Sequence, residues 1–146
     1  MASNANLYNK IVLTPSNKGP APTPKMYRGF STINTNSENF SLYDFYLIQQ
    51  DILNHFNTRQ GERLMNPEFG CVIWDYIYEP LTADVQGQII ENVNRIINYD
   101  PRVQASQVMV TSYQSGIQLE CVLTYLPYNV SQAMQIRFDQ ANGMLV

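Results

Sequence analysis

The chain has 146 residues, with nine basic and twelve acidic side chains, a net charge of −3 and no long run of either sign. This balance excludes the basic footprint of a nucleic-acid-binding protein, and the length has room for one domain with a modest core. No apolar stretch approaches the roughly 20 residues that cross a bilayer, and the first residues lack the apolar segment of a signal peptide. The sequence therefore predicts a protein made and kept in the cytoplasm, with neither nucleic acid nor membrane as a partner.

Charged side chains make up only 14% of the chain, whereas a typical soluble domain has about 25%. Two interpretations stay open: a surface that other proteins cover, or an ordinary neutral polar surface. The two cysteines, Cys71 and Cys121, match no zinc or redox spacing, which predicts two reduced, buried thiols. With a single histidine besides, the chain offers no familiar metal site, and neither metal nor cofactor is expected.

Residues 1–35 are predicted as an extended N-terminal arm and residues 36–146 as the folded domain. The arm contains four prolines within ten residues, Pro15, Pro20, Pro22 and Pro24. Prolines remove backbone donors and favour extended, polyproline-like conformations. The arm is either a disordered tail or a segment that orders against a neighbouring subunit, and a short edge strand is expected near its end, at residues 29–33.

A first helix is predicted to begin at Ser41, because Ser41 and Asp44 have a spacing like that of a capping box. Apolar residues then recur at helical steps, which predicts one buried stripe: Leu42, Phe45, Ile48, Ile52 and Phe56. The only histidine, His55, lies beside this stripe at the helix end, where a packing or capping role is favoured over catalysis.

An elbow follows the first helix. Gly61 allows a sharp turn, and Asn66-Pro67 marks a second one, because the residue before a proline is pushed out of the helical region. Glu62 and Arg63 place opposite charges on this constrained loop, where a local ion pair or cap is the simplest interpretation.

A short helix of about two turns is predicted next, with apolar residues from Phe69 to Tyr78 and a stop at Pro80. Trp74 in this segment is favoured as a core residue, with an interface anchor as the alternative.

The longest helix is predicted to begin at the cap Thr82 and to stop near Tyr99, because Asp100 precedes a proline. Its buried stripe is formed by Val85, Ile89, Val93 and Ile96. Pro101 then holds Arg102 just beyond the helix end, where its guanidinium can bond the last carbonyls or reach the carboxylate of a partner.

The remaining residues alternate between apolar and polar side chains and predict a three-stranded antiparallel meander, with turns at Ser115-Gly116 and Pro127-Tyr128-Asn129. The fold class is therefore α+β: an extended arm, two main helices and a short helix, packed on three strands. The last strand, around Ala133–Asp139, carries little charge to protect its edge. This edge either accepts a strand from another chain or is covered by the arm of this protein.

Four motifs within about 45 residues also resemble a known family in their order and spacing. They are Gly61-Glu62-Arg63, Asn66-Pro67-Glu68-Phe69-Gly70, Leu81-Thr82-Ala83-Asp84 and Tyr99-Asp100-Pro101-Arg102. Together they resemble the small baseplate wedge subunit of contractile phage tails, a family shared with the baseplates of type VI secretion systems. The family usually ends its long helix with Glu-Pro-Arg, and Asp100 shortens that acid by one methylene.

The resemblance implies a structural protein of the virion tail baseplate, assembled in the host cytoplasm. The implied partners are other wedge proteins and the tail sheath protein, which would be templated by the sheet edge, with no small-molecule substrate. The implied partner-binding residues lie at the elbow and at the helix end: Gly61, Glu62, Arg63, Asn66, Pro67, Phe69, Asp100, Pro101 and Arg102.

Members of this family have also been labelled lysozyme-like, which gives one enzymatic alternative. Glycoside hydrolysis needs two carboxylates roughly 5 to 10 Å apart, and four acids crowd the elbow: Glu62, Glu68, Asp75 and Glu79. However, a small helical layer on a meander leaves little room for a sugar-binding cleft. A protein without catalytic residues is therefore favoured over a peptidoglycan hydrolase.

Overall fold

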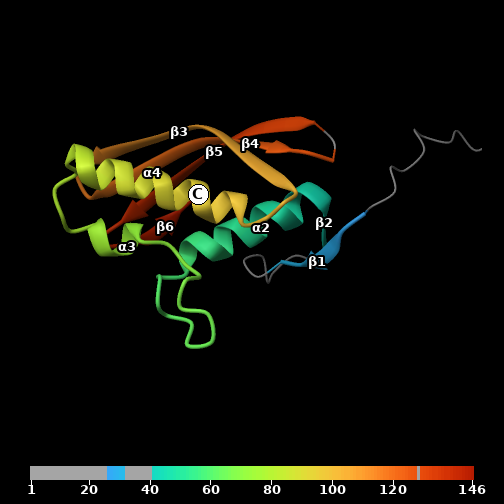
Figure 1. Cartoon of the computed structure of the whole chain (residues 1–146), viewed down its shortest axis with the longest axis horizontal. Helices are drawn as coiled ribbons and strands as arrows, with labels where there is room; N and C mark the ends of the chain where they lie inside the picture. Colours follow the sequence, from blue (N-terminus) through green and yellow to red (C-terminus); the bar gives the residue numbers. More distant parts are fainter. Residues whose placement is uncertain (1–25, 32–40, 128) are drawn as a thin grey trace, which may run out of the picture.

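The computed structural model describes residues 26–31, 41–127 and 129–146. Within them, helices α2 (Asp44–Asn57) and α4 (Ala83–Asn98), with the short α3 (Ile73–Tyr76), cover one face of an antiparallel sheet (Figure 1). The sheet has the order β3-β4-β5-β6. The predicted α+β class and the three helices are confirmed, but α3 has a single turn instead of two.

The four strands of this sheet are β3 (Val103–Tyr113), β4 (Gly116–Tyr125), β5 (Val130–Asp139) and β6 (Gly143–Leu145). The first three form the predicted meander. The prediction of three strands was wrong, because β6 adds a fourth that pairs with β5 at Arg137–Asp139. The turn into β6 spans residues 140–142, and Gly143, the first residue of β6, has a φ of 76° that glycine adopts without strain.

A second, two-stranded sheet joins β1 (Arg28–Phe30) to β2 (Ser41–Tyr43). The predicted helix start at Ser41 was therefore wrong, since Ser41 and Leu42 are paired strand residues. Asp44 opens α2, and its carboxylate accepts hydrogen bonds from the backbone nitrogens of Met26, at 2.9 Å, and Tyr27, at 2.8 Å. The Asp44 side chain therefore bonds residues 26 and 27 to the start of α2 and does not cap the helix.

Most of the predicted arm, and with it the question of whether the arm covers the sheet edge, lies outside the described residues. Residues 28–30 of the predicted arm form β1, close to the strand expected at 29–33.

The core lies between the helices and the sheet. Its largest fully buried side chains come from α2, α3, α4 and the three long strands: Tyr125, Phe56, Phe138, Ile48, Ile73, Ile89, Ile97, Leu119, Leu123, Ile136, Val93 and Val110. The predicted stripes of both main helices lie largely in this core. Cys71 and Cys121 are free and buried, as predicted, and burial raises the pKa of their thiols to about 12 and about 11. Of the helices in the described ranges, none combines the length and apolar character that crossing a membrane requires.

Both predicted boundaries of α4 are confirmed. The Thr82 hydroxyl caps it by accepting a hydrogen bond from the backbone nitrogen of Val85, at 3.4 Å, and Tyr99 is its last cap. Trp74 is half-buried against the core, and its indole nitrogen donates to the backbone oxygen of Phe56 at 2.8 Å. The core position predicted for Trp74 is therefore confirmed.

Candidate functional site

The elbow between α2 and α3 is a closed loop that projects from the domain (Figure 1). Its base is closed where the Cys71 nitrogen donates to the Thr58 oxygen, at 2.8 Å. Higher up, the Gly61 nitrogen donates to the Pro67 oxygen, at 3.0 Å. Gly70 has a φ of 117°, and a Cβ placed there would lie 2.7 Å from the backbone of Arg59. The chain can therefore close this tightly only with glycine at position 70.

Glu62 and Arg63 do not form the expected ion pair. The Glu62 carboxylate accepts a hydrogen bond from the backbone nitrogen of Arg59 at 3.1 Å, which is the capping alternative. The Arg63 guanidinium carbon instead lies 3.8 Å from the centroid of the Phe69 ring, a cation–π distance.

The other face of the Phe69 ring is occupied by His55. The two ring centroids are 3.8 Å apart and the planes are within 11° of parallel, and two groups cannot share one face at that distance. Phe69 is therefore sandwiched between α2 and Arg63. His55 is 7% exposed, and burial, followed by the charges of Arg95 and Arg63, lowers its pKa to about 4. At neutral pH the imidazole is thus an uncharged packing group.

At the end of α4, Arg102 is held by carboxylates of its own chain. Its Nε lies 2.8 Å and 3.1 Å from the two oxygens of Asp100, and its Nη2 lies 2.5 Å from Asp100 Oδ2 and 3.4 Å from Asp51 Oδ2. The predicted bonds from this guanidinium to helix carbonyls are not made. The guanidinium carbon also lies 4.8 Å from the centroid of the Tyr27 ring.

The Arg102 hydrogen bonds are the main cause of the lowered pKa of Asp100, and the same bonds raise the pKa of Arg102. The pair is therefore ionised at neutral pH, and it links the end of α4 to Asp51 on α2. Nη1 takes no part in these hydrogen bonds.

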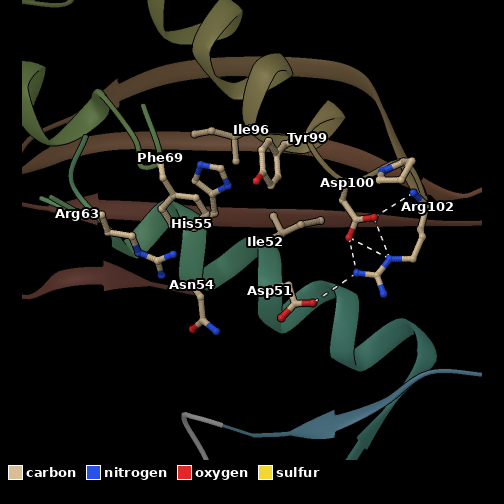
Figure 2. A pocket seen from close by; sticks show the side chains of 11 residues that line it. Asp51, Ile52, Asn54, His55, Arg63, Phe69, Ile96, Tyr99, Asp100 and Arg102 are labelled. Carbon is tan, nitrogen blue, oxygen red and sulfur yellow. Dashed lines mark hydrogen bonds and ion pairs between the residues drawn. The ribbon is translucent and has the colours of Figure 1, made fainter. Parts of the chain in front are cut away.

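These two clusters lie along one groove of about 500 Å³ between α2, the elbow and the end of α4. Figure 2 shows Arg63 towards one end and the Asp100–Arg102 pair towards the other. The lining residues are Asp51, Ile52, Asn54, His55, Arg63, Phe69, Ile96, Tyr99, Asp100, Pro101 and Arg102. Five of the nine predicted partner-binding residues thus converge on one surface.

The other four predicted residues do not line the groove. Gly61 and Pro67 bond each other across the loop and Glu62 caps it, whereas Asn66 lines a smaller adjoining hollow of about 170 Å³. They shape or flank the loop that carries Arg63 and Phe69.

The predicted partner-binding residues included none from α2 and did not include Tyr99. Asp51 and His55 are one helical turn apart and both line the groove, so their four-residue spacing was the available signal. Tyr99 is 68% exposed, and its ring packs edge-on against that of His55, with centroids 5.7 Å apart.

The four elbow acids do not assemble a catalytic pair in the groove. All four are exposed, none lines the groove, and Asp75 is ion-paired with Arg59. In the part of the chain that the structure describes, no group of three or more His, Cys, Asp or Glu side chains could hold a metal ion.

Comparison with known proteins decides the family. A model of the family described as "Baseplate wedge protein gp25" matches residues 46–126, more than half of the chain, from the third residue of α2 to just past the end of β4. This chain belongs to that family. The resemblance carried by the elbow and helix-end motifs is confirmed.

The chain is also similar to a curated protein and to a solved structure. It is 41% identical over 66 residues to baseplate wedge protein gp25 of Enterobacteria phage T4, an alignment that covers 43% of this chain and 48% of the T4 protein. The matched region thus spans about half the length of that relative. A crystal structure from Geobacter sulfurreducens, named provisionally as a tail lysozyme, superposes with a TM-score of 0.56 at 21% identity, over 64% of this chain and 88% of the other. At that identity the likeness shows a shared fold.

Proposed function

We propose that this chain is a structural, non-enzymatic subunit of a contractile-tail baseplate wedge, and that its groove grips the helices of partner wedge subunits. The observation that carries the proposal is the convergence of Arg63 and Phe69 from the elbow with Asp100, Pro101 and Arg102 from the helix end on one groove. In this proposal the protein is assembled in the host cytoplasm and resides in the tail baseplate.

The groove has the features of a helix-binding surface. Its apolar lining comes from Ile52, Ile96, Phe69 and the exposed ring of Tyr99, which suits the apolar stripe of an amphipathic helix. Arg63 is exposed and can pair with an acid of that helix. At the other end, Arg102 can donate from Nη1 without giving up its bonds to Asp100.

The main sheet offers a second contact, for the sheath protein. Its β3 edge is interrupted by a bulge between Ser106 and Met109, where Gln107 has a φ of 53°, and such bulges blunt an edge. The β5 edge is regular, and β6 pairs with it only at residues 137–139, so that no other strand of the described residues pairs with residues 130–136 on this side. We infer that a sheath strand adds to β5 there, as in other cases of strand addition.

Co-purification with the neighbouring tail proteins tests the wedge assignment. Wild type is expected to form a stable complex, and Arg102→Ala to lose roughly 2 to 5 kcal/mol of binding free energy if the contact is buried. Arg137→Ala, an exposed arginine on β5, is the matched control and is expected to bind normally. Because Arg102 also bonds Asp100 and Asp51, the melting temperature of each variant is measured alongside. A folded Arg102→Ala with wild-type affinity would refute the groove as the contact.

The alternative, a peptidoglycan hydrolase, rests on the family label and on the acids near the elbow. We expect no turnover of purified peptidoglycan. Turnover that disappears in both Glu68→Gln and Asp75→Asn would overturn the structural assignment.

A further inference from the structure

The tip of the elbow loop carries the two most exposed large apolar side chains of the described residues. Leu64 is 94% exposed and Met65 is 98% exposed, whereas the next, Tyr78, is 74% exposed. Single exposed apolar residues are normal on a protein surface, but here two adjacent ones stand at the end of a projecting loop.

Hydrogen bonds within the loop brace this tip. On its far side the backbone nitrogen of Asn66 donates to the Arg63 oxygen at 3.2 Å, and that of Phe69 donates to the Asn66 oxygen at 3.1 Å. Arg63, just before the tip, is stacked on Phe69. A braced loop loses little conformational entropy on binding, so the burial of its side chains contributes more fully to affinity.

We propose that Leu64 and Met65 form an anchor that inserts into an apolar socket with a basic rim, on the wedge subunit whose helix occupies the groove. This inference rests on the proposed function and names a second contact with the same partner. Arg63 lines the groove, and Leu64 is the next residue in the chain. A partner that occupies the groove therefore lies next to the tip as well.

The basic rim follows from the charges around the tip. Glu62 and Glu68 are exposed on either side of it, whereas the one cation between them, Arg63, is turned back over Phe69. The carboxylates of Glu62 and Glu68 thus flank two apolar side chains, although one Glu62 oxygen also accepts the hydrogen bond from the backbone nitrogen of Arg59. The same charges disfavour an anionic membrane surface, which attracts basic segments.

The test is a titration of purified protein with the tail protein that co-purifies with wild type. Because the variant loses the burial of two large apolar side chains, Leu64→Ser/Met65→Ser is expected to bind at least about 100-fold more weakly. The matched control is Met109→Ser/Leu126→Ser, which removes a methionine and a leucine that are 57% and 51% exposed elsewhere. This control is expected to bind as wild type does. Glu62→Gln/Glu68→Gln is expected to slow association and flatten its dependence on salt, because rim charges act mainly on the on-rate.

The outcomes separate the anchor from the wedge assignment. If wild type binds, Arg102→Ala is weakened and the tip variant binds normally, the anchor is overturned while the proposed function stands. A control that loses as much affinity as the tip variant also overturns the anchor, since the loss is then not specific to the tip. A wild type that binds no tail protein, or that binds anionic vesicles through Leu64 and Met65, overturns the partner assignment itself.

Discussion

The buried histidine of the groove predicts a loss of stability in mild acid. His55 has a pKa of about 4 in the folded protein, against 6.5 when unperturbed. Above pH 6.5 both states are neutral and the stabilisation is complete. Between pH 6.5 and 4 the unfolded chain binds a proton that the folded chain does not, so the free energy of unfolding falls as the pH is lowered.

The size of this effect follows from the shift. Each pKa unit corresponds to 1.36 kcal/mol, which gives an upper bound of about 3 kcal/mol for His55. Since the groove is open to solvent, screening reduces this to on the order of 1 to 2 kcal/mol. The lowered pKa of Asp100 acts in a separate window: its stabilisation persists down to about pH 3.8 and is lost as the pH falls through its folded pKa.

Urea unfolding of wild type and His55→Phe at pH 7 and pH 4.5 measures the effect. Phenylalanine keeps a ring against Phe69 and removes the titrating group, so the difference between the proteins is expected to grow by 1 to 2 kcal/mol in favour of the variant on acidification. Identical pH dependence in the two proteins would refute the assignment of a neutral, buried His55. Intrinsic differences between the two rings are already present at pH 7 and cancel in this comparison.

Two further predictions concern the elbow and the sheet edge. Gly70→Ala is expected to destabilise the protein by roughly 2 kcal/mol or more, because of its positive φ and the backbone 2.7 Å from the new Cβ. Gly61→Ala has a positive φ but open space around it, so it should cost only about 1 kcal/mol in the same unfolding assay; equal costs would contradict the packing argument. Ala133→Lys/Gln135→Lys, on the open part of β5, is expected to leave wedge binding intact and to slow sheath polymerisation. Gln104→Lys/Thr111→Lys on β3 should leave both wedge binding and sheath polymerisation unchanged, and equal slowing by this pair would refute the choice of edge.

The sequence predicted well those elements in which the spacing of apolar side chains fits only one kind of secondary structure. The long helix and the three long strands each show one clear apolar period, and both ends of the long helix are confirmed. The turn predicted at Ser115-Gly116 lies one residue earlier, at Gln114-Ser115, because Gly116 already pairs in β4. The second predicted turn includes Tyr128, which lies outside the described residues. The helix start at Ser41 failed for a different reason. A capping-box pattern is local, whereas Ser41 to Tyr43 are paired with residues 28–30, and no local pattern contains that tertiary pairing. The prediction missed the fourth strand although Asn142-Gly143 is a common hairpin signal. Here the loop is residues 140–142, and Gly143 begins the strand in the left-handed region.

The candidate site shows the same division. Five of the residues that the motifs singled out line one groove, because they flank turns and a helix end that proline and glycine define. The sequence could not show that Arg102 is bonded to Asp100 and Asp51. The first contact is two residues away, but the second spans 51 residues and depends on how α2 and α4 pack. For the same reason the sequence predicted a packing role for His55 but not that its ring stacks on that of Phe69.

The shorter acid at position 100 is consistent with this local bonding. Asp100 Oδ1 accepts a hydrogen bond from the backbone nitrogen of Arg102 at 3.0 Å, in addition to those from the Arg102 side chain. A carboxylate one methylene from its own backbone can reach the nitrogen two residues on, which is an Asx-type turn, whereas the longer side chain of Glu is less suited to that turn. In this chain the aspartate therefore orients both the backbone turn at Pro101 and the guanidinium. The rigidity of this end of the groove comes from the Asp-Pro-Arg segment itself, and the contact with Asp51 ties that segment to α2.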